Sequence, residues 1–139
     1  MWRPLALVAL MSLTAACQTG SDPGTSPLVP TVNPTTENFS GTVDVGGADS
    51  HPFTITQTGG QVNVTLTAAG PPSTIFMGIG VGSWSDPTCT LLSGASTIAQ
   101  AGTIAQLSGT ATAGAYCVKV YDVGNQTAQV TYTVTVSHF

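Results

Sequence analysis

Charged side chains are scarce in this chain, and basic ones are almost absent. Only 6% of the residues are charged, with two Lys or Arg against six Asp or Glu. A nucleic-acid-binding surface needs clustered Lys and Arg to contact phosphates, so the composition argues against nucleic acid as a partner. Salt bridges can contribute little to the fold for the same reason. The surface must instead be covered by Ser, Thr, Asn, Gln and Gly.

The sequence also lacks an apolar run of the roughly 20 residues that a membrane-spanning helix needs. A short run from Leu5 to Leu13 follows Arg3 and is followed in turn by small residues and Cys17, which is the pattern of an export signal. The ending Leu13-Thr14-Ala15-Ala16-Cys17 resembles the lipobox of bacterial lipoproteins, in which the cysteine is acylated and becomes the first residue. This resemblance implies that residues 1–16 are removed and that Cys17 carries the lipid.

The same resemblance implies a lipid-anchored protein of the bacterial cell envelope, with the membrane as a partner through the anchor. Gln18 follows the cysteine at the position where an Asp retains some lipoproteins in the inner membrane, so the outer membrane is the expected location. Acyl chains contribute about 0.8 kcal/mol per buried methylene, so a diacyl or triacyl anchor holds without any protein contact.

The three cysteines support this interpretation, because three is an odd number. Assigning Cys17 to the lipid leaves Cys89 and Cys117 as a natural disulfide pair in an oxidising compartment. A metal or redox role for two cysteines so far apart in sequence is the weaker alternative. Alternation along the chain places the Cys117 side chain with Lys119 and Tyr121, away from the core, so the bridge is expected at an outer face or a sheet edge.

Composition divides the chain into a signal peptide (1–16), a tether (17–36) and a domain (37–139). The tether is rich in Ser, Thr, Pro and Gly, a composition that cannot bury enough apolar surface to offset the entropy of ordering. In the domain, apolar residues recur at every second position, as in strands with one buried face. The alternating sets are Phe39, Val43 and Val45; Phe53 and Ile55; Val62, Val64 and Leu66; Ile75, Met77, Ile79 and Val81; Tyr116, Val118 and Val120; and Val130, Tyr132, Val134 and Val136.

Gly and Pro turns separate these runs, and no part of the domain has helical periodicity. Many short strands in a domain of this size predict an all-β fold, an antiparallel β-sandwich.

Two segments of the chain resemble bacterial pre-peptidase C-terminal domains, namely Phe39–Leu66 and Ala113–Val136. Their clearest parts are Gly60-Gln61-Val62-Asn63-Val64-Thr65-Leu66 and Gly114-Ala115-Tyr116-Cys117-Val118. That resemblance implies a jelly-roll-like or Greek-key sandwich that accompanies secreted enzymes without catalysing a reaction. The chain departs from the family at Ile75–Val81, where glycines alternate with the apolar residues.

No catalytic residue and no cofactor are predicted. Asp49-Ser50-His51 contains the residue types of a hydrolase triad, but neighbours in one short turn cannot generally converge as nucleophile, base and orienting group. A hydrolase that uses His51 is therefore the least favoured hypothesis. His138, next to the C-terminus, is expected in solvent, and two isolated histidines argue against a zinc site.

Asp44 and Asp49 flank a Gly-Gly turn and are weak calcium candidates. A calcium site needs six or more oxygen ligands, so solvated acids are the favoured interpretation and no metal is predicted. Trp84 lies in a predicted loop, and an exposed loop aromatic can stack on a sugar, with Tyr121 as the second ring. A loop Trp more often packs against the end of a sandwich, which is the alternative interpretation of this residue. A glycan-binding module is thus the alternative to the leading hypothesis, a non-catalytic binding or scaffolding domain whose partner is an envelope protein or polysaccharide.

Overall fold

The computed structural model describes residues 32–139, so the predicted signal peptide, Cys17 and most of the predicted tether lie outside the described residues. Within this range there is no helix that could cross a membrane. The eight strands are β1 (Thr35–Val43), β2 (Ala48–Ile55), β3 (Gly60–Gly70), β4 (Met77–Ser85), β5 (Thr88–Ala99), β6 (Leu107–Ala111), β7 (Gly114–Tyr121) and β8 (Val130–His138). The first strand begins two residues before the start expected for the domain.

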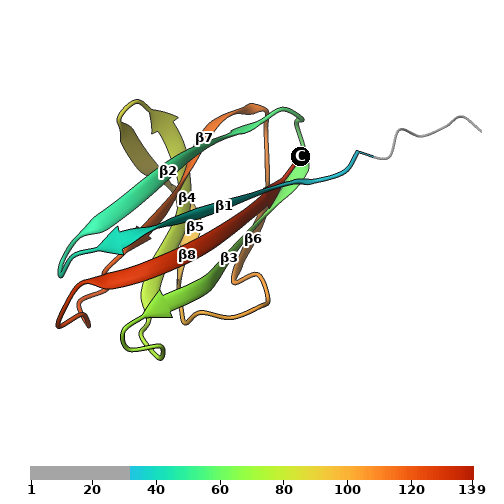
Figure 1. Ribbon diagram of the computed structural model, residues 1–139. Coiled ribbons are helices and arrows are strands. Elements are labelled where there is room, and N and C mark those ends of the chain that lie inside the picture. The colour runs from blue at the N-terminus through green and yellow to red at the C-terminus, as the bar shows by residue number, and fades with distance from the viewer. Residues whose placement is uncertain (1–31) are drawn as a thin grey trace, which may run out of the picture. The chain divides into compact units, whose positions relative to one another are not determined.

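The strands form two four-stranded sheets that pack face to face (Figure 1). One sheet has the order β1-β8-β3-β6 and the other has the order β2-β7-β4-β5, with every neighbouring pair antiparallel. The chain crosses from one sheet to the other after every strand except β4, which is joined to β5 within the same sheet. This is the strand order of a jelly roll. The predicted antiparallel β-sandwich is confirmed.

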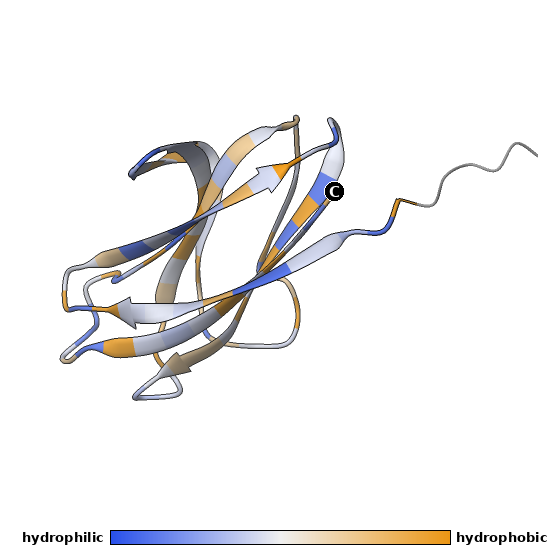
Figure 2. Ribbon diagram, turned by 45° about the horizontal axis from the view of Figure 1, so that its top comes forward, coloured by the Kyte–Doolittle hydropathy of each residue, from blue (hydrophilic) through white to orange (hydrophobic). Residues whose placement is uncertain are grey.

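The core lies between the sheets and is built mainly by alternate residues of β2, β3, β4, β7 and β8. Figure 2 shows the resulting alternation of hydrophobic and hydrophilic bands along the strands. The buried core consists of Val43, Phe53, Ile55, Val62, Val64, Leu66, Ala69, Ile75, Met77, Ile79, Val81, Ala99, Val118, Val120, Val130, Tyr132, Val134 and Val136. The prediction that Val45 joins this core is wrong, because its side chain is 58% exposed. The strand ends at Val43, and the turn that follows is closed by the Gly47 N–H donating to the Asp44 carbonyl (2.8 Å).

Asp122 joins two loops at one end of the sandwich. Its Oδ2 accepts a hydrogen bond from the Gly46 N–H (2.7 Å) in the β1–β2 turn. Its Oδ1 accepts from three successive N–H groups of the β7–β8 loop, those of Gly124, Asn125 and Gln126. The Gly46 N–H, followed by those of the β7–β8 loop, lowers the pKa of Asp122 below its ordinary value of 3.8 despite opposing desolvation. Charge-assisted bonds of this kind favour the ionised carboxylate.

Asp122→Asn is therefore expected to lower the melting temperature at neutral pH. Because the pKa of Asp122 is lower in the folded state, its stabilising effect is present above the ordinary pKa and is lost as the pH falls through the folded value. The variant should consequently lose less stability than the wild type between pH 4 and pH 2. Thermal melts across this range measure both effects, with the exposed Asp86→Asn as the matched charge change. Equal behaviour of the two variants would contradict the assignment.

Candidate functional site

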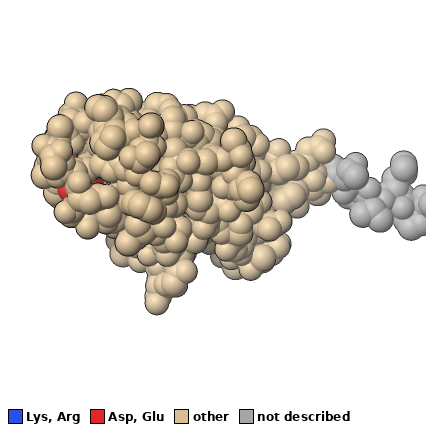
Figure 3. Space-filling view, turned by 90° about the horizontal axis from the view of Figure 1, so that it is seen from below, with Lys and Arg blue, Asp and Glu red and all other residues tan. Residues whose placement is uncertain are grey.

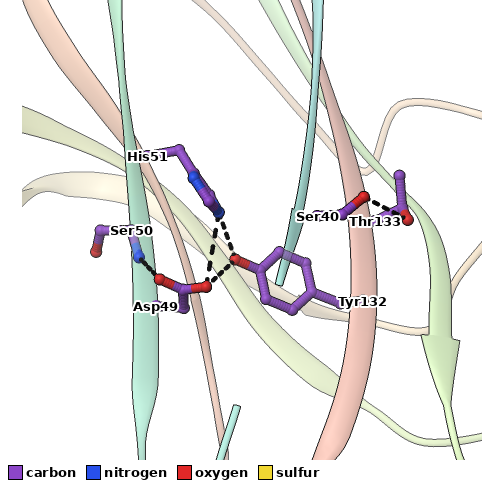
Figure 4. A network of polar contacts seen from close by, with 6 residues as sticks. All are labelled: Ser40, Asp49, Ser50, His51, Tyr132 and Thr133. Carbon is purple, nitrogen blue, oxygen red and sulfur yellow. Dashed lines mark hydrogen bonds and ion pairs between the residues drawn. The ribbon is translucent and has the colours of Figure 1, made fainter. Parts of the chain in front are cut away.

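The described residues contain one compact cluster of chemically active side chains, formed by Asp49, His51 and Tyr132 (Figure 4). The prediction that Asp49, Ser50 and His51 lie in a turn is wrong, because they belong to β2. Asp49 and His51 are two residues apart on this strand, so both point to the same face of it. The Tyr132 hydroxyl, from β8, donates to Asp49 Oδ2 (2.7 Å), and His51 Nε2 lies 2.7 Å from the same hydroxyl oxygen. Because the Tyr132 hydroxyl donates its hydrogen to Asp49, its oxygen accepts the bond with His51. His51 is therefore the donor, in the tautomer that carries the hydrogen on Nε2.

The cluster occupies the open side of the sandwich between the edge strands β1 and β2. The Tyr132 ring belongs to the buried core, whereas His51 and Asp49 keep 24% and 34% of their side chains exposed. Gly41 of β1 is required there, because a Cβ at this position would overlap Asp49 Oδ2 and lie 2.9 Å from the Tyr132 hydroxyl. Phe39, also on β1, stacks on the His51 ring with centroids 5.0 Å apart. The cluster therefore links both sheets through hydrogen bonds and ring packing.

This geometry holds the sandwich closed and does not assemble a hydrolase triad. Asp49 and His51 converge, which the sequence did not predict, but their common partner is a phenol. The intervening Ser50 alternates to the opposite face of β2, as Figure 4 shows, and only its backbone N–H contacts Asp49 Oδ1 (2.8 Å). Burial raises the pKa of Tyr132 well above its ordinary value, and the hydrogen bond to the Asp49 carboxylate and its charge raise it further. Tyr132 thus stays protonated as a donor.

Tyr132→Phe is expected to lower the free energy of unfolding by about 1 kcal/mol at neutral pH, because the paired hydroxyl is lost. It should also flatten the loss of stability at alkaline pH. A pKa that is raised in the folded state contributes stability that is present below the ordinary value of 10.0 and is lost as the pH rises above it. Urea denaturation between pH 7 and pH 11 measures both effects. Tyr116→Phe is the control. The role given to Tyr132 would be refuted if the pH dependence of the free energy of unfolding were unchanged by Tyr132→Phe but changed by Tyr116→Phe.

The prediction that His138 is solvated is wrong. His138 is only 3% exposed, because β8 continues to this position and places the imidazole ring between the sheets. His138 Nε2 lies 2.8 Å from Glu37 Oε1 of β1, and the ring packs against Phe53 of β2 with centroids 5.2 Å apart. Both histidines of the chain therefore lie along the open side between β1 and β2, each near a carboxylate.

The outer face of the second sheet explains the alternating glycines of β4. A Cβ on Gly78 would overlap the Tyr121 ring, and one on Gly80 would lie 2.6 Å from the Leu91 side chain. A Cβ on Gly82 would lie 3.0 Å from Cys117 Sγ. Gly78 and Gly80 thus let a side chain from a neighbouring strand cross β4, as aromatic side chains cover glycines in other sheets. Gly82 makes room for the Thr90 backbone carbonyl of β5 as well as for Cys117.

The predicted disulfide between Cys89 and Cys117 is present, with an S–S distance of 2.03 Å. It lies on the outer face, where alternation predicts it, since Val118 and Val120 supply the core side of β7. Cys117 is nevertheless fully buried, because the bridge packs over the Gly82 backbone.

The prediction that Trp84 lies in a loop is wrong, because Trp84 belongs to β4 and pairs with Cys89 of β5. Trp84 and Tyr121 share this outer face but lie at opposite ends of it. Tyr121 is the register partner of Gly78, whereas Trp84 is six residues further along β4, beside Cys89. Six residues of a strand span about 20 Å, so the two rings cannot hold the same sugar unit. Tyr121 instead lines a shallow cleft of about 280 Å³ together with Lys119 and Asp122. Glycan binding by either ring alone stays a prediction.

The two weak calcium candidates have separate hydrogen-bonding roles. The exposed Asp44 accepts from Gln129 Nε2 (2.7 Å), whereas Asp49 belongs to the cluster with Tyr132. Among residues 32–139, no group of three or more His, Cys, Asp or Glu side chains is placed to hold a metal ion. Charged groups are sparse on the surface as well, and the face in Figure 3 is almost free of them.

Comparison with known proteins gives no family. No family model matches the chain, and no curated protein is similar to it in sequence. Among solved structures, the chain is similar to PliG from Aeromonas hydrophila, a periplasmic lysozyme inhibitor of g-type lysozyme. The two are 13% identical with a TM-score of 0.44, over 75% of this chain and 86% of that chain. The fold assignment rests on the strand pairings described above.

Proposed function

We propose that this chain is an exported lipoprotein whose acylated Cys17 holds a non-catalytic binding domain at the bacterial cell envelope, in the outer membrane. The observation that carries the proposal is the pairing of the cysteines. Cys89 and Cys117 are joined to each other, which leaves Cys17 as the odd cysteine, directly after the export signal. A disulfide of this kind is typical of oxidising compartments outside the cytoplasm.

A binding role agrees with the chemistry of the described residues. Their most reactive side chains, Asp49, His51 and Tyr132, are engaged with one another and hold the two sheets together. Ser50, the only hydroxyl of the Asp-Ser-His motif, faces away from them. A partner would therefore be recognised by surfaces of the sandwich rather than transformed by this cluster.

Metabolic labelling with a clickable fatty acid tests the anchor. The wild-type chain should be labelled and should sediment with outer-membrane fractions, whereas Cys17→Ala should carry no label and leave the membrane fraction. Cys89→Ala is the matched control, because it removes a cysteine without removing the attachment site. Absence of label on the wild type, or equal labelling of Cys17→Ala, would refute lipid anchoring; label in inner-membrane fractions would refute only the outer-membrane location.

A further inference from the structure

The sandwich has two open sides, and they differ in how their strand edges are protected. β1 and β2 are the end strands on one side, and β5 and β6 are the end strands on the other (Figure 1). Each end strand has a hydrogen-bonded neighbour on one side only, so the other edge offers backbone N–H and C=O groups to an incoming strand. Natural proteins protect such edges with charged residues, proline or bulges.

The β1/β2 side has this protection. Glu37, Asp49, His51 and Pro52 all lie on these two strands. Tyr132 closes the gap at one point, and the contact between His138 and Glu37 closes it at another. An added strand on this side would meet charged groups and a residue that has no backbone N–H.

The β5/β6 side has neither charge nor proline. The sequences of β5 (TCTLLSGASTIA) and β6 (LSGTA) contain no Asp, Glu, Lys, Arg, His or Pro. The one protective device there is a break in the pairing of β5 with β4, where the register shifts between Gly80 and Gly82. Gly94, with φ of 75°, lies in the part of β5 that leaves the ladder.

A pocket opens where β5 leaves the ladder. It has a volume of about 160 Å³ and reaches the core residues Val62, Val64 and Val81. Its rims are the bulged part of β5, residues 92–95, and the whole of β6. No charged residue lines it, and Leu92 at its edge is 42% exposed. The pocket thus lies directly beside two strand edges that carry neither charge nor proline.

We infer that the β5/β6 side binds an extended, uncharged segment of another polypeptide, which adds as a strand to β6 and places an apolar side chain in the pocket. Backbone groups of an edge strand supply affinity in this recognition mode, and pockets for alternate side chains supply specificity. The lack of charge in the pocket and on both edges selects an uncharged segment, and β6 is long enough to pair with about five residues. The inference rests on the proposed binding role.

Fluorescence anisotropy with a labelled, capped peptide that alternates Thr and Val over seven residues tests the inference on the purified full chain. Gly109→Lys places a charge on β6 at a position where a Cβ meets nothing within 4 Å, so the fold should tolerate it. We expect this variant to weaken binding at least tenfold. Thr54→Lys adds the same charge to β2 on the other open side and should change binding less than twofold. The same peptide with a central proline should not bind.

Three results would overturn the inference: no binding at millimolar peptide, equal binding of the proline peptide, or equal weakening by Thr54→Lys. A concentration-dependent dimer in sedimentation that Gly109→Lys dissolves would also overturn it, by assigning this side to a second copy of the chain. Fatty-acid labelling of Cys17 is independent of all these results. A labelled protein that does not bind the peptide would therefore refute this inference and leave the anchor in place.

Discussion

Gly82→Ala is expected to destabilise the domain severely, lowering the free energy of unfolding by about 3 kcal/mol. The added Cβ would overlap the carbonyl oxygen of Thr90, which belongs to the backbone of β5, and would lie 3.0 Å from Cys117 Sγ. Neither group can move away easily, because Thr90 lies in the ladder with β4 and Cys117 is held by the disulfide. Urea denaturation of wild type and variant measures the difference.

Two other glycines serve as controls for this prediction. Gly109→Ala should be neutral or slightly stabilising, because a Cβ there meets nothing within 4 Å and alanine reduces the entropy of the unfolded chain. Gly78→Ala should have an intermediate effect, since the overlapping atoms belong to the Tyr121 side chain, which can rotate. If Gly82→Ala and Gly109→Ala have equal stability, the close approach of the Thr90 carbonyl and Cys117 to β4 is not what requires glycine at position 82.

The alternation of apolar residues made most of the sandwich predictable. β3 and β8 each bury one face. The alternating residues Val62, Val64 and Leu66 therefore reveal β3 in the sequence, and Val134 and Val136 reveal part of β8. The strands β5 and β6 escaped prediction because they lie at an open side, where few of their side chains are buried and Ser, Thr, Gly and Ala fill both faces. A period of two is visible only where one face of a strand is excluded from water.

The cluster at the β1/β2 side could not be predicted, because its members are far apart in sequence. Asp49 and Tyr132 are separated by 83 residues and meet only because β8 lies beside β1 in one sheet while β2 borders the other. The burial of His138 depends in the same way on the partners Glu37 and Phe53. A signal was present in the strand periodicity, since His138 continues the even-numbered set that contains Val134 and Val136.

Removing the disulfide by Cys89→Ala together with Cys117→Ala is expected to lower the free energy of unfolding by about 3–4 kcal/mol. The two cysteines are 28 residues apart, and the loop-entropy model relates the stabilisation to the length of the loop that the bridge closes. Loss of the fully buried Cys117 side chain adds a packing cost in the same direction. Chemical denaturation with and without a reductant measures the effect. Reduction should destabilise the wild type and leave the double variant unchanged.

The single variant Cys89→Ala tests whether Cys17 has a free thiol, and so tests the proposed lipid anchor. It leaves Cys117 without its partner, and if Cys17 carried a free thiol the two would be able to join in an oxidising compartment. If Cys17 is acylated, no such bond can form, and non-reducing mass spectrometry should find Cys117 as a free thiol. A bond between Cys17 and Cys117 in this variant, or between Cys17 and either cysteine in the wild type, would contradict the cysteine assignment. The lipid anchor would then lose its main support, whereas the sandwich, which rests on the strand pairings, would stand.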